Sequence, residues 1–170
     1  MNISDDTFFL GDIPVETLMQ EYGSPLYVYE ESVLRSQFRQ LASGFPEELL
    51  EIHYSMKANS NPSLLKILLE EGSAIDAVSE FEVRLALESG FEPQQIIFTG
   101  NNNTLAEIEN CVEKGVSVNL GSLALLEKYG QRYPQTSVSV RINPGIGAGH
   151  HAHCITGGPD SKFGIYHDQI

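Results

Sequence analysis

The side chain with the clearest potential for chemistry in this sequence is Lys57. It lies near the end of an apolar-leaning run, residues 52–58, that predicts a β-strand, and a polar segment and a helical stretch follow at once. The ammonium group is therefore expected at the carboxyl end of a strand, where βα-barrel enzymes carry their active sites. A lysine in that place either holds a phosphate group or forms a Schiff base.

The surroundings of Lys57 favour a functional role. An apolar strand is a costly place for an isolated charge, because desolvation penalises the ammonium unless it is paired or used covalently. A Schiff-base lysine must be partly neutral to attack an aldehyde, and burial or a neighbouring cation favours the neutral amine. The sequence alone leaves both uses of Lys57 open.

Two further charged residues are expected at the same rim of the sheet. Asp76 and Arg141 come at the ends of two other predicted strands. An ammonium, a carboxylate and a guanidinium on separate strands suit an anionic ligand. Ser79 and Ser122 also follow strands, but a serine there is equally well explained as a helix N-cap.

The loop after Arg141 invites a metal-binding interpretation. It is rich in glycine and holds potential ligands at His150, His151, His153 and Cys154. No second cluster and no regular ligand spacing accompany them, so we predict no metal site. The glycines of this loop match neither a Walker pattern nor a dinucleotide-binding fingerprint.

The elements that must position these residues alternate between short strands and longer helices. The predicted strands are residues 52–58, 74–78, 96–99, 116–120 and 138–142, and the predicted helices between them are residues 63–71, 80–89, 104–114 and 122–133. A βα unit thus recurs about every 20–25 residues, which implies a parallel sheet with right-handed crossovers. Such a sheet is either open and doubly wound or closed into an eight-stranded barrel.

The two ends of the sequence differ from this repeat. Residues 15–22 and 32–43 predict helices, and residues 26–29 predict a strand that is either a barrel element or part of another domain. Residues 162–170 predict the start of another helix. A complete barrel needs about 250 residues, so we expect the chain to stop inside a domain.

Composition restricts the partners. With 23 acidic and 10 basic side chains and a net charge of -13, the chain is a poor partner for nucleic acid or an anionic membrane. Its first residues lack the basic region of a signal peptide, and no apolar run approaches the roughly 20 residues that span a bilayer. Two distant cysteines without a CxxC pattern are typical of reduced thiols. We expect a cytoplasmic protein that binds a small molecule.

Several motifs, in the right order, resemble those of the fold-type III pyridoxal-phosphate decarboxylases. They are residues 23–29 (GSPLYVY), 54–59 (YSMKAN), 76–82 (DAVSEFE), 141–144 (RINP), 150–153 (HHAH), 156–159 (TGGP) and 161–165 (SKFGI). The resemblance implies an α/β fold, a (β/α)8 TIM-type barrel of the alanine-racemase-like kind followed by a C-terminal β domain. This chain would hold roughly the first five βα units. Residues 1–25 would associate with the β domain, and residues 26–170 would form an incomplete pyridoxal-phosphate-binding barrel.

Residues 141–165 are similar to the diaminopimelate decarboxylases of this family. That resemblance implies a carboxy-lyase that converts meso-2,6-diaminopimelate to L-lysine and carbon dioxide, the last step of lysine biosynthesis. Lys57 would form the internal aldimine with pyridoxal 5'-phosphate, and Asp76 and Arg141 match polar active-site positions. Glu82 is a weaker match, and Lys162 matches a lysine near a subunit interface. The resemblance also implies a homodimer at full length. Members of this family are much longer than this chain, so we expect no activity from these residues alone.

The resemblance leaves alternatives. Another enzyme of the same fold could act on ornithine, arginine or carboxynorspermidine, or could racemise alanine; residues 150–164 argue against these. A non-catalytic pyridoxal-phosphate carrier lacks the segment found here at residues 9–29. A half-length protein used for binding or regulation is the third class.

Overall fold

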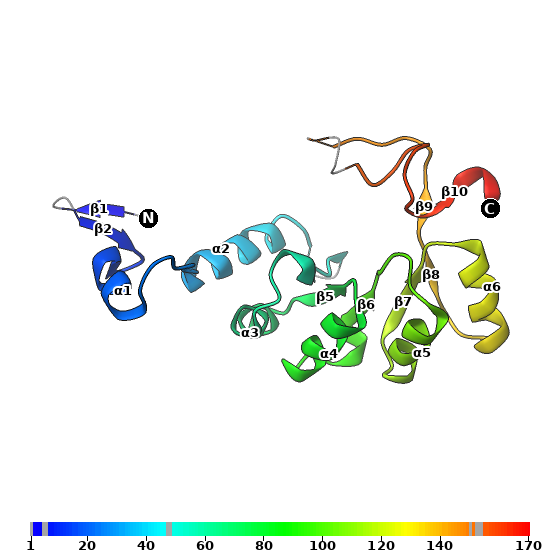
Figure 1. The fold of residues 1–170 in the computed structure, drawn as a ribbon, viewed down its shortest axis with the longest axis horizontal. Helices are drawn as coiled ribbons and strands as arrows, with labels where there is room; N and C mark the ends of the chain where they lie inside the picture. The colour runs from blue at the N-terminus through cyan, green and yellow to red at the C-terminus, as the bar shows by residue number, and fades with distance from the viewer. Residues whose placement is uncertain (1, 5–6, 47–48, 150, 152–154) are drawn as a thin grey trace. The chain divides into compact units, whose positions relative to one another are not determined.

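The structure, a computed structural model, describes residues 2–4, 7–46, 49–149, 151 and 155–170. The chain divides into two compact units, Met1–Glu51 and Ile52–Ile170. Figure 1 shows the elements of both. Among the described residues, no helix combines the length and the apolar character needed to cross a membrane. The prediction that residues 1–25 associate with a later β domain stays a prediction.

The first unit combines a small antiparallel sheet with two helices. Its elements are β1 (Asn2–Ser4), β2 (Thr7–Leu10), β3 (Ile13–Pro14), α1 (Val15–Tyr22) and α2 (Glu31–Ala42). Both helices were predicted, whereas the three short strands were not. The strand predicted at residues 26–29 is wrong, because this extended segment pairs with no described strand.

The second unit is built on a parallel sheet of five strands. They are β4 (His53–Ser55), β5 (Ala74–Ala77), β6 (Ile96–Phe98), β7 (Ser117–Leu120) and β8 (Ser139–Val140). Their order across the sheet is their order in the chain, and every pair is parallel. A doubly wound sheet would place later strands on both sides of the first. The sequential order is that of a βα barrel, which confirms the predicted fold class for the part present here.

A helix follows each of the first four strands, as predicted. The helices are α3 (Pro62–Glu70), α4 (Glu80–Glu88), α5 (Leu105–Glu113) and α6 (Leu123–Arg132). Each begins after a residue whose side chain accepts a backbone N–H of the first turn: Asn61, Ser79, Thr104 and Ser122. These caps satisfy amides that the helix leaves unpaired. Within this unit the four helices lie on the same side of the strands (Figure 1).

The core lies between these helices and one face of the sheet. It includes Ile75, Ala77, Ile96, Phe98, Val118 and Leu120 from the strands and Leu65, Val83 and Ile108 from the helices. Successive side chains of a strand point to opposite faces. Asp76, Ile97 and Asn119 therefore lie on the other face, which in a barrel is the interior.

The last strand of the sheet is interrupted at Arg141. Beyond it, β9 (Ile142–Asn143) pairs in parallel with β10 (Ile165–Tyr166), and a 3-10 turn, η5 (His167–Gln169), follows. The helix predicted at residues 162–170 is therefore wrong. Gly164 has a φ of 80°, and a Cβ there would lie 3.0 Å from both Arg141 O and Asn143 N, so the chain turns tightly against β9 and pairs with it.

A candidate active site at the carboxyl end of the sheet

Lys57 lies beyond the end of β4, in the 3-10 turn η2 (Met56–Ala58). The predicted strand over residues 52–58 is too long, because the chain turns after Ser55. Met56 takes the buried position of the turn at 1% exposure, and the Lys57 side chain is exposed. The expectation of a lysine desolvated within an apolar strand is therefore wrong. Its location at the carboxyl end of a strand is as predicted, and η2 contacts the neighbouring strand β5.

Asp76 joins three adjacent strands at the same rim. Its Oδ2 accepts a hydrogen bond from Ser55 Oγ of β4 at 2.8 Å, and its Oδ1 accepts one from Thr99 Oγ1, directly after β6. The Thr99 amide also donates to Ala77 O of β5 at 2.8 Å. The carboxylate is half-buried, and each of its oxygens has a hydroxyl donor.

Arg141 lies farther along the rim, directly after β8. Three strand spacings of about 4.8 Å, roughly 14 Å measured across the sheet, separate β8 from β5, the strand of Asp76. Its guanidinium carbon lies 4.6 Å from the centre of the Phe163 ring, and its Nη2 donates to Thr156 O at 3.5 Å. The structure thus brings Lys57 and Asp76 onto neighbouring elements and holds Arg141 against the loop that follows β9.

That loop is fastened by Asn143 and Tyr166. The Asn143 side chain, 1% exposed, accepts from the amides of Gly145 and Gly158 at 3.0 Å and donates to Gly158 O at 3.1 Å. The Tyr166 hydroxyl lies within 3.3 Å of three carbonyl oxygens, those of Gly158, Pro159 and Ser161. Two distant residues therefore hold one segment of the loop.

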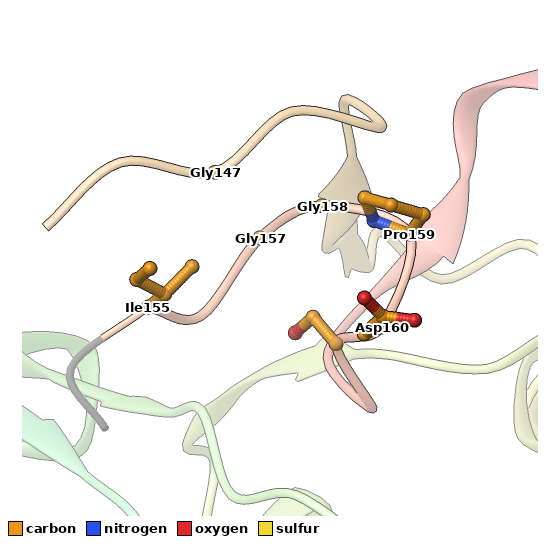
Figure 2. A pocket seen from close by; sticks show the side chains of 7 residues that line it. Gly147, Ile155, Gly157, Gly158, Pro159 and Asp160 are labelled. Carbon is orange, nitrogen blue, oxygen red and sulfur yellow. The ribbon is translucent and has the colours of Figure 1, made fainter. Parts of the chain in front are cut away.

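The loop encloses a pocket of about 340 Å³ lined by Gly147, Ile155 and residues 157–161. Figure 2 shows the arm that carries Gly147 facing the arm that carries Ile155, Gly157 and Gly158. A Cβ at Gly147 would lie 2.4 Å from Gly157 O, so the two arms approach too closely for any other residue. Gly158, which Asn143 binds, also lines the pocket and so connects it to the strand end of Arg141.

Glu82 and Lys162, which the resemblance singled out, have observed neighbours. Glu82 Oε2 accepts from the Val78 amide at 2.6 Å, and the Glu82 amide donates to Ser79 Oγ, so Glu82 closes the first turn of α4. Lys162 Nζ lies 5.5 Å from the centre of the Phe163 ring. It also lines a small pocket with residues 100–103.

Two amide side chains at the rim have buried atoms without hydrogen-bond partners in the described part of the chain. They are Asn101 Nδ2, after β6, and Asn119 Oδ1, on β7. Leaving such a group unpaired costs about 1–3 kcal/mol. A ligand at the rim could supply the missing donor and acceptor.

Ser55 was not predicted as a site residue. The signal that could have found it is its spacing from Lys57, because residues two apart in a predicted strand share one face.

Most of the potential metal ligands in the loop after Arg141 lie outside the described part of the chain. His150, His153 and Cys154 belong to the undescribed positions. Within the described ranges, no group of three or more potential ligands gathers. The prediction of no metal site stays a prediction.

Comparison with known proteins identifies the family. Residues 31–170 match the sequence model described as "Pyridoxal-dependent decarboxylase, pyridoxal binding domain". Curated relatives named diaminopimelate decarboxylase include one from Methanothermobacter thermautotrophicus, 43% identical over 92% of this chain and 37% of its own length. One from Escherichia coli K12 is 34% identical over 94% of this chain and 38% of its own length.

Solved structures agree. Diaminopimelate decarboxylase from Helicobacter pylori, complexed with L-lysine, has a TM-score of 0.82 at 32% identity, over 91% of this chain and 41% of that one. The enzyme of the same name from M. jannaschii, also with L-lysine, has a TM-score of 0.84 at 28% identity, over 99% of this chain and 41% of that one. The chain thus spans about two fifths of these relatives. It belongs to the family of pyridoxal-dependent decarboxylases, within their pyridoxal-binding domain.

Proposed function

We propose that this chain carries the cofactor-binding lysine of a pyridoxal-phosphate-dependent decarboxylase that converts meso-2,6-diaminopimelate to L-lysine and carbon dioxide. The observation that carries the proposal is Lys57, an exposed amine at the carboxyl end of a strand in a chain of this family. Because the chain spans only part of its relatives, the complete reaction is proposed for a protein that includes the remaining elements. A homodimer and a cytoplasmic location stay predictions for that protein.

The residues at the rim fit pyridoxal phosphate. The cofactor needs an amine for its aldehyde, and within the described residues Lys57 has no carboxylate or hydrogen-bond partner that would occupy its Nζ. At the same rim, Asn101 has a buried donor and Asn119 a buried acceptor for which the described part of the chain offers no partner. The chain therefore offers both a covalent attachment point and unfilled polar contacts.

Each proposed site residue has a role that its chemistry allows. Lys57 Nζ would bind the aldehyde carbon, with the aldehyde oxygen leaving as water, and would hold the ligand at the strand end. When bound, the cofactor withdraws electrons from the bond that breaks. Asp76 presents a negative charge whose position the strands fix, and Arg141 presents a planar cation suited to a carboxylate or a phosphate.

The relatives support diaminopimelate as the substrate. Eight curated relatives that we compared carry the name diaminopimelate decarboxylase. A second candidate is a decarboxylase of the kind found in Vibrio vulnificus, a lysine/ornithine decarboxylase complexed with putrescine. That structure matches less well, with a TM-score of 0.65 over 69% of this chain.

A cofactor titration tests the proposal. Pyridoxal phosphate is added to the chain, and the visible absorbance of protein-bound cofactor is followed. We expect saturable binding for the wild type and its loss in Lys57→Arg, which keeps the charge but cannot form the covalent bond under these conditions. Lys66→Arg, at an exposed position of α3, is the matched control. Equal binding by the wild type and Lys57→Arg would contradict the proposal.

A further inference from the structure

We infer that Ser55 and Thr99 are positioning residues, which hold the Asp76 carboxylate in place beside the Lys57 turn and so strengthen binding of pyridoxal phosphate. The inference rests on the proposed function and extends it to two residues that have no role there. Neither residue needs to touch the cofactor, because each acts through Asp76.

The geometry around Asp76 supports this inference. Ser55 Oγ donates to Oδ2 at 2.8 Å, and Thr99 Oγ1 donates to Oδ1, so the two hydroxyls approach the carboxylate from opposite neighbouring strands. Ser55 and Asp76 are paired in the register of β4 and β5. A carboxylate held at both oxygens, by one donor at the end of β4 and another directly after β6, has little freedom to rotate.

The network also reaches Lys57. Ser55 is the last residue of β4, and the turn η2 that carries Lys57 begins with the next residue. That turn contacts β5, the strand of Asp76. The hydrogen bond between Ser55 and Asp76 therefore fastens the base of the Lys57 turn to the neighbouring strand.

The charge of the Asp76 carboxylate explains why it needs hydrogen bonds from two hydroxyls. A half-buried carboxylate loses part of its hydration, and the loss is tolerated where hydrogen bonds replace it. Hydrogen bonds to a charged group are stronger than those between neutral groups. Removing one hydroxyl would leave the carboxylate short of a donor and free to turn away from the rim.

The competing interpretation is that Ser55 and Thr99 only join the strands. In that case their loss would lower stability, and its effect on cofactor binding would be independent of the charge at Asp76. A double-mutant cycle separates the two interpretations, because residues that act through one another are not additive.

The test uses the full 170-residue chain and the dissociation constant of pyridoxal phosphate, measured by visible absorbance. We expect Thr99→Val and Ser55→Ala each to weaken binding about tenfold, the size of one hydrogen bond to a charged group. Thr99→Ser, which keeps the hydroxyl, should restore near-wild-type binding. In an Asp76→Asn background, Thr99→Val or Ser55→Ala should change binding by less than about twofold.

Ser117→Ala is the matched control, since Ser117 is an exposed serine of β7 on the same face as Asp76 and contacts neither hydroxyl donor in any described hydrogen bond. Circular dichroism checks that each variant is folded. One folded hydroxyl variant, either Ser55→Ala or Thr99→Val, is enough for a double-mutant cycle with Asp76→Asn. Equal effects with Asp76 present and in the Asp76→Asn background, or no rescue by Thr99→Ser, would overturn the inference and leave the proposed function standing. Failure of the wild-type chain to bind the cofactor would overturn both.

Discussion

Asn143 provides the sharpest test of how the chain holds the loop around Arg141. Its buried side chain bonds the amides of Gly145 and Gly158 and the carbonyl of Gly158. The Gly158 carbonyl keeps a second donor, the Tyr166 hydroxyl at 3.3 Å, whereas no other partner for the Gly158 amide is described. Asn143→Ala therefore leaves one buried amide unpaired.

The expected loss of loop stability in Asn143→Ala follows from these hydrogen bonds. An unpaired buried donor costs about 1–3 kcal/mol, and the half-buried Gly145 amide can turn to water at a smaller cost. We expect the loop to lose about 2 kcal/mol of stability against local opening, equivalent to roughly a 30-fold increase in the open fraction. Arg141 would then lose the Thr156 carbonyl that its guanidinium contacts.

Hydrogen–deuterium exchange measures this effect locally. The peptide covering residues 155–166 should exchange roughly 30-fold faster in Asn143→Ala, while a peptide covering β5 should be unchanged. Asn110→Ala is the matched control, because the half-buried Asn110 side chain bonds Glu80, between α5 and α4 and not in this loop. Unchanged protection of residues 155–166 in Asn143→Ala would refute the reasoning that Asn143 fastens this loop.

Three further predictions concern the core and two titrating groups. Phe98→Ala should lower the free energy of unfolding by about 3–5 kcal/mol, measured by urea denaturation, because Phe98 is fully buried in the core; a loss below about 1 kcal/mol would contradict that placement. Burial raises the pKa of the Cys111 thiol to about 11. In the unfolded chain the thiol is exposed and ionises near its ordinary pKa of 9.0, so between pH 9 and 11 ionisation stabilises the unfolded state relative to the folded one. The free energy of unfolding should therefore fall as the pH rises from 9 toward 11, and Cys111→Ala should reduce this fall. Hydrogen bonds from the Thr104 amide and hydroxyl lower the pKa of the Glu107 carboxyl. The stability that this carboxyl contributes is present above its unfolded pKa and lost as the pH falls through its folded pKa. Thr104→Ala removes the hydroxyl bond and leaves the amide bond, so this acid-side loss should become smaller without disappearing; an unaltered acid limb would contradict this.

The regular elements were predictable because their signals are local. Apolar spacing located the four helices of the second unit. The structure shows a capping box of Thr104 and Glu107 at the start of α5, another signal that lies within four consecutive residues. The order of the strands was not predictable from periodicity alone. A repeating βα pattern fits both a barrel and a doubly wound sheet, and only the pairing decides between them.

The errors arose where contacts between distant residues decide the local structure. Residues 162–170 look helical, yet Gly164 approaches the backbone of Arg141 and directs the chain into β10. Residues 26–29 have the composition of a strand but no described strand to pair with. A strand depends on its partner, which the local sequence does not contain.

The positions of the candidate site residues were predictable from the sequence, and the hydrogen bonds between them were not. Strand ends located Lys57, Asp76 and Arg141, because parallel strands deliver their carboxyl ends to one rim. The exposure of Lys57 follows from a turn in which Met56 takes the buried place. The bonds from Ser55 and Thr99 to Asp76 depend on the register of three strands, which no single stretch of sequence specifies.

The most direct test of the central claim is the location of the cofactor on the chain. Pyridoxal phosphate is added, the complex is reduced with borohydride, and the digested chain is mapped by mass spectrometry. The chain has four other lysines as internal competitors, Lys66, Lys114, Lys128 and Lys162. We expect a dominant adduct on Lys57 that disappears in Lys57→Arg without moving to another lysine. An adduct spread evenly over the five lysines of a folded chain would contradict it.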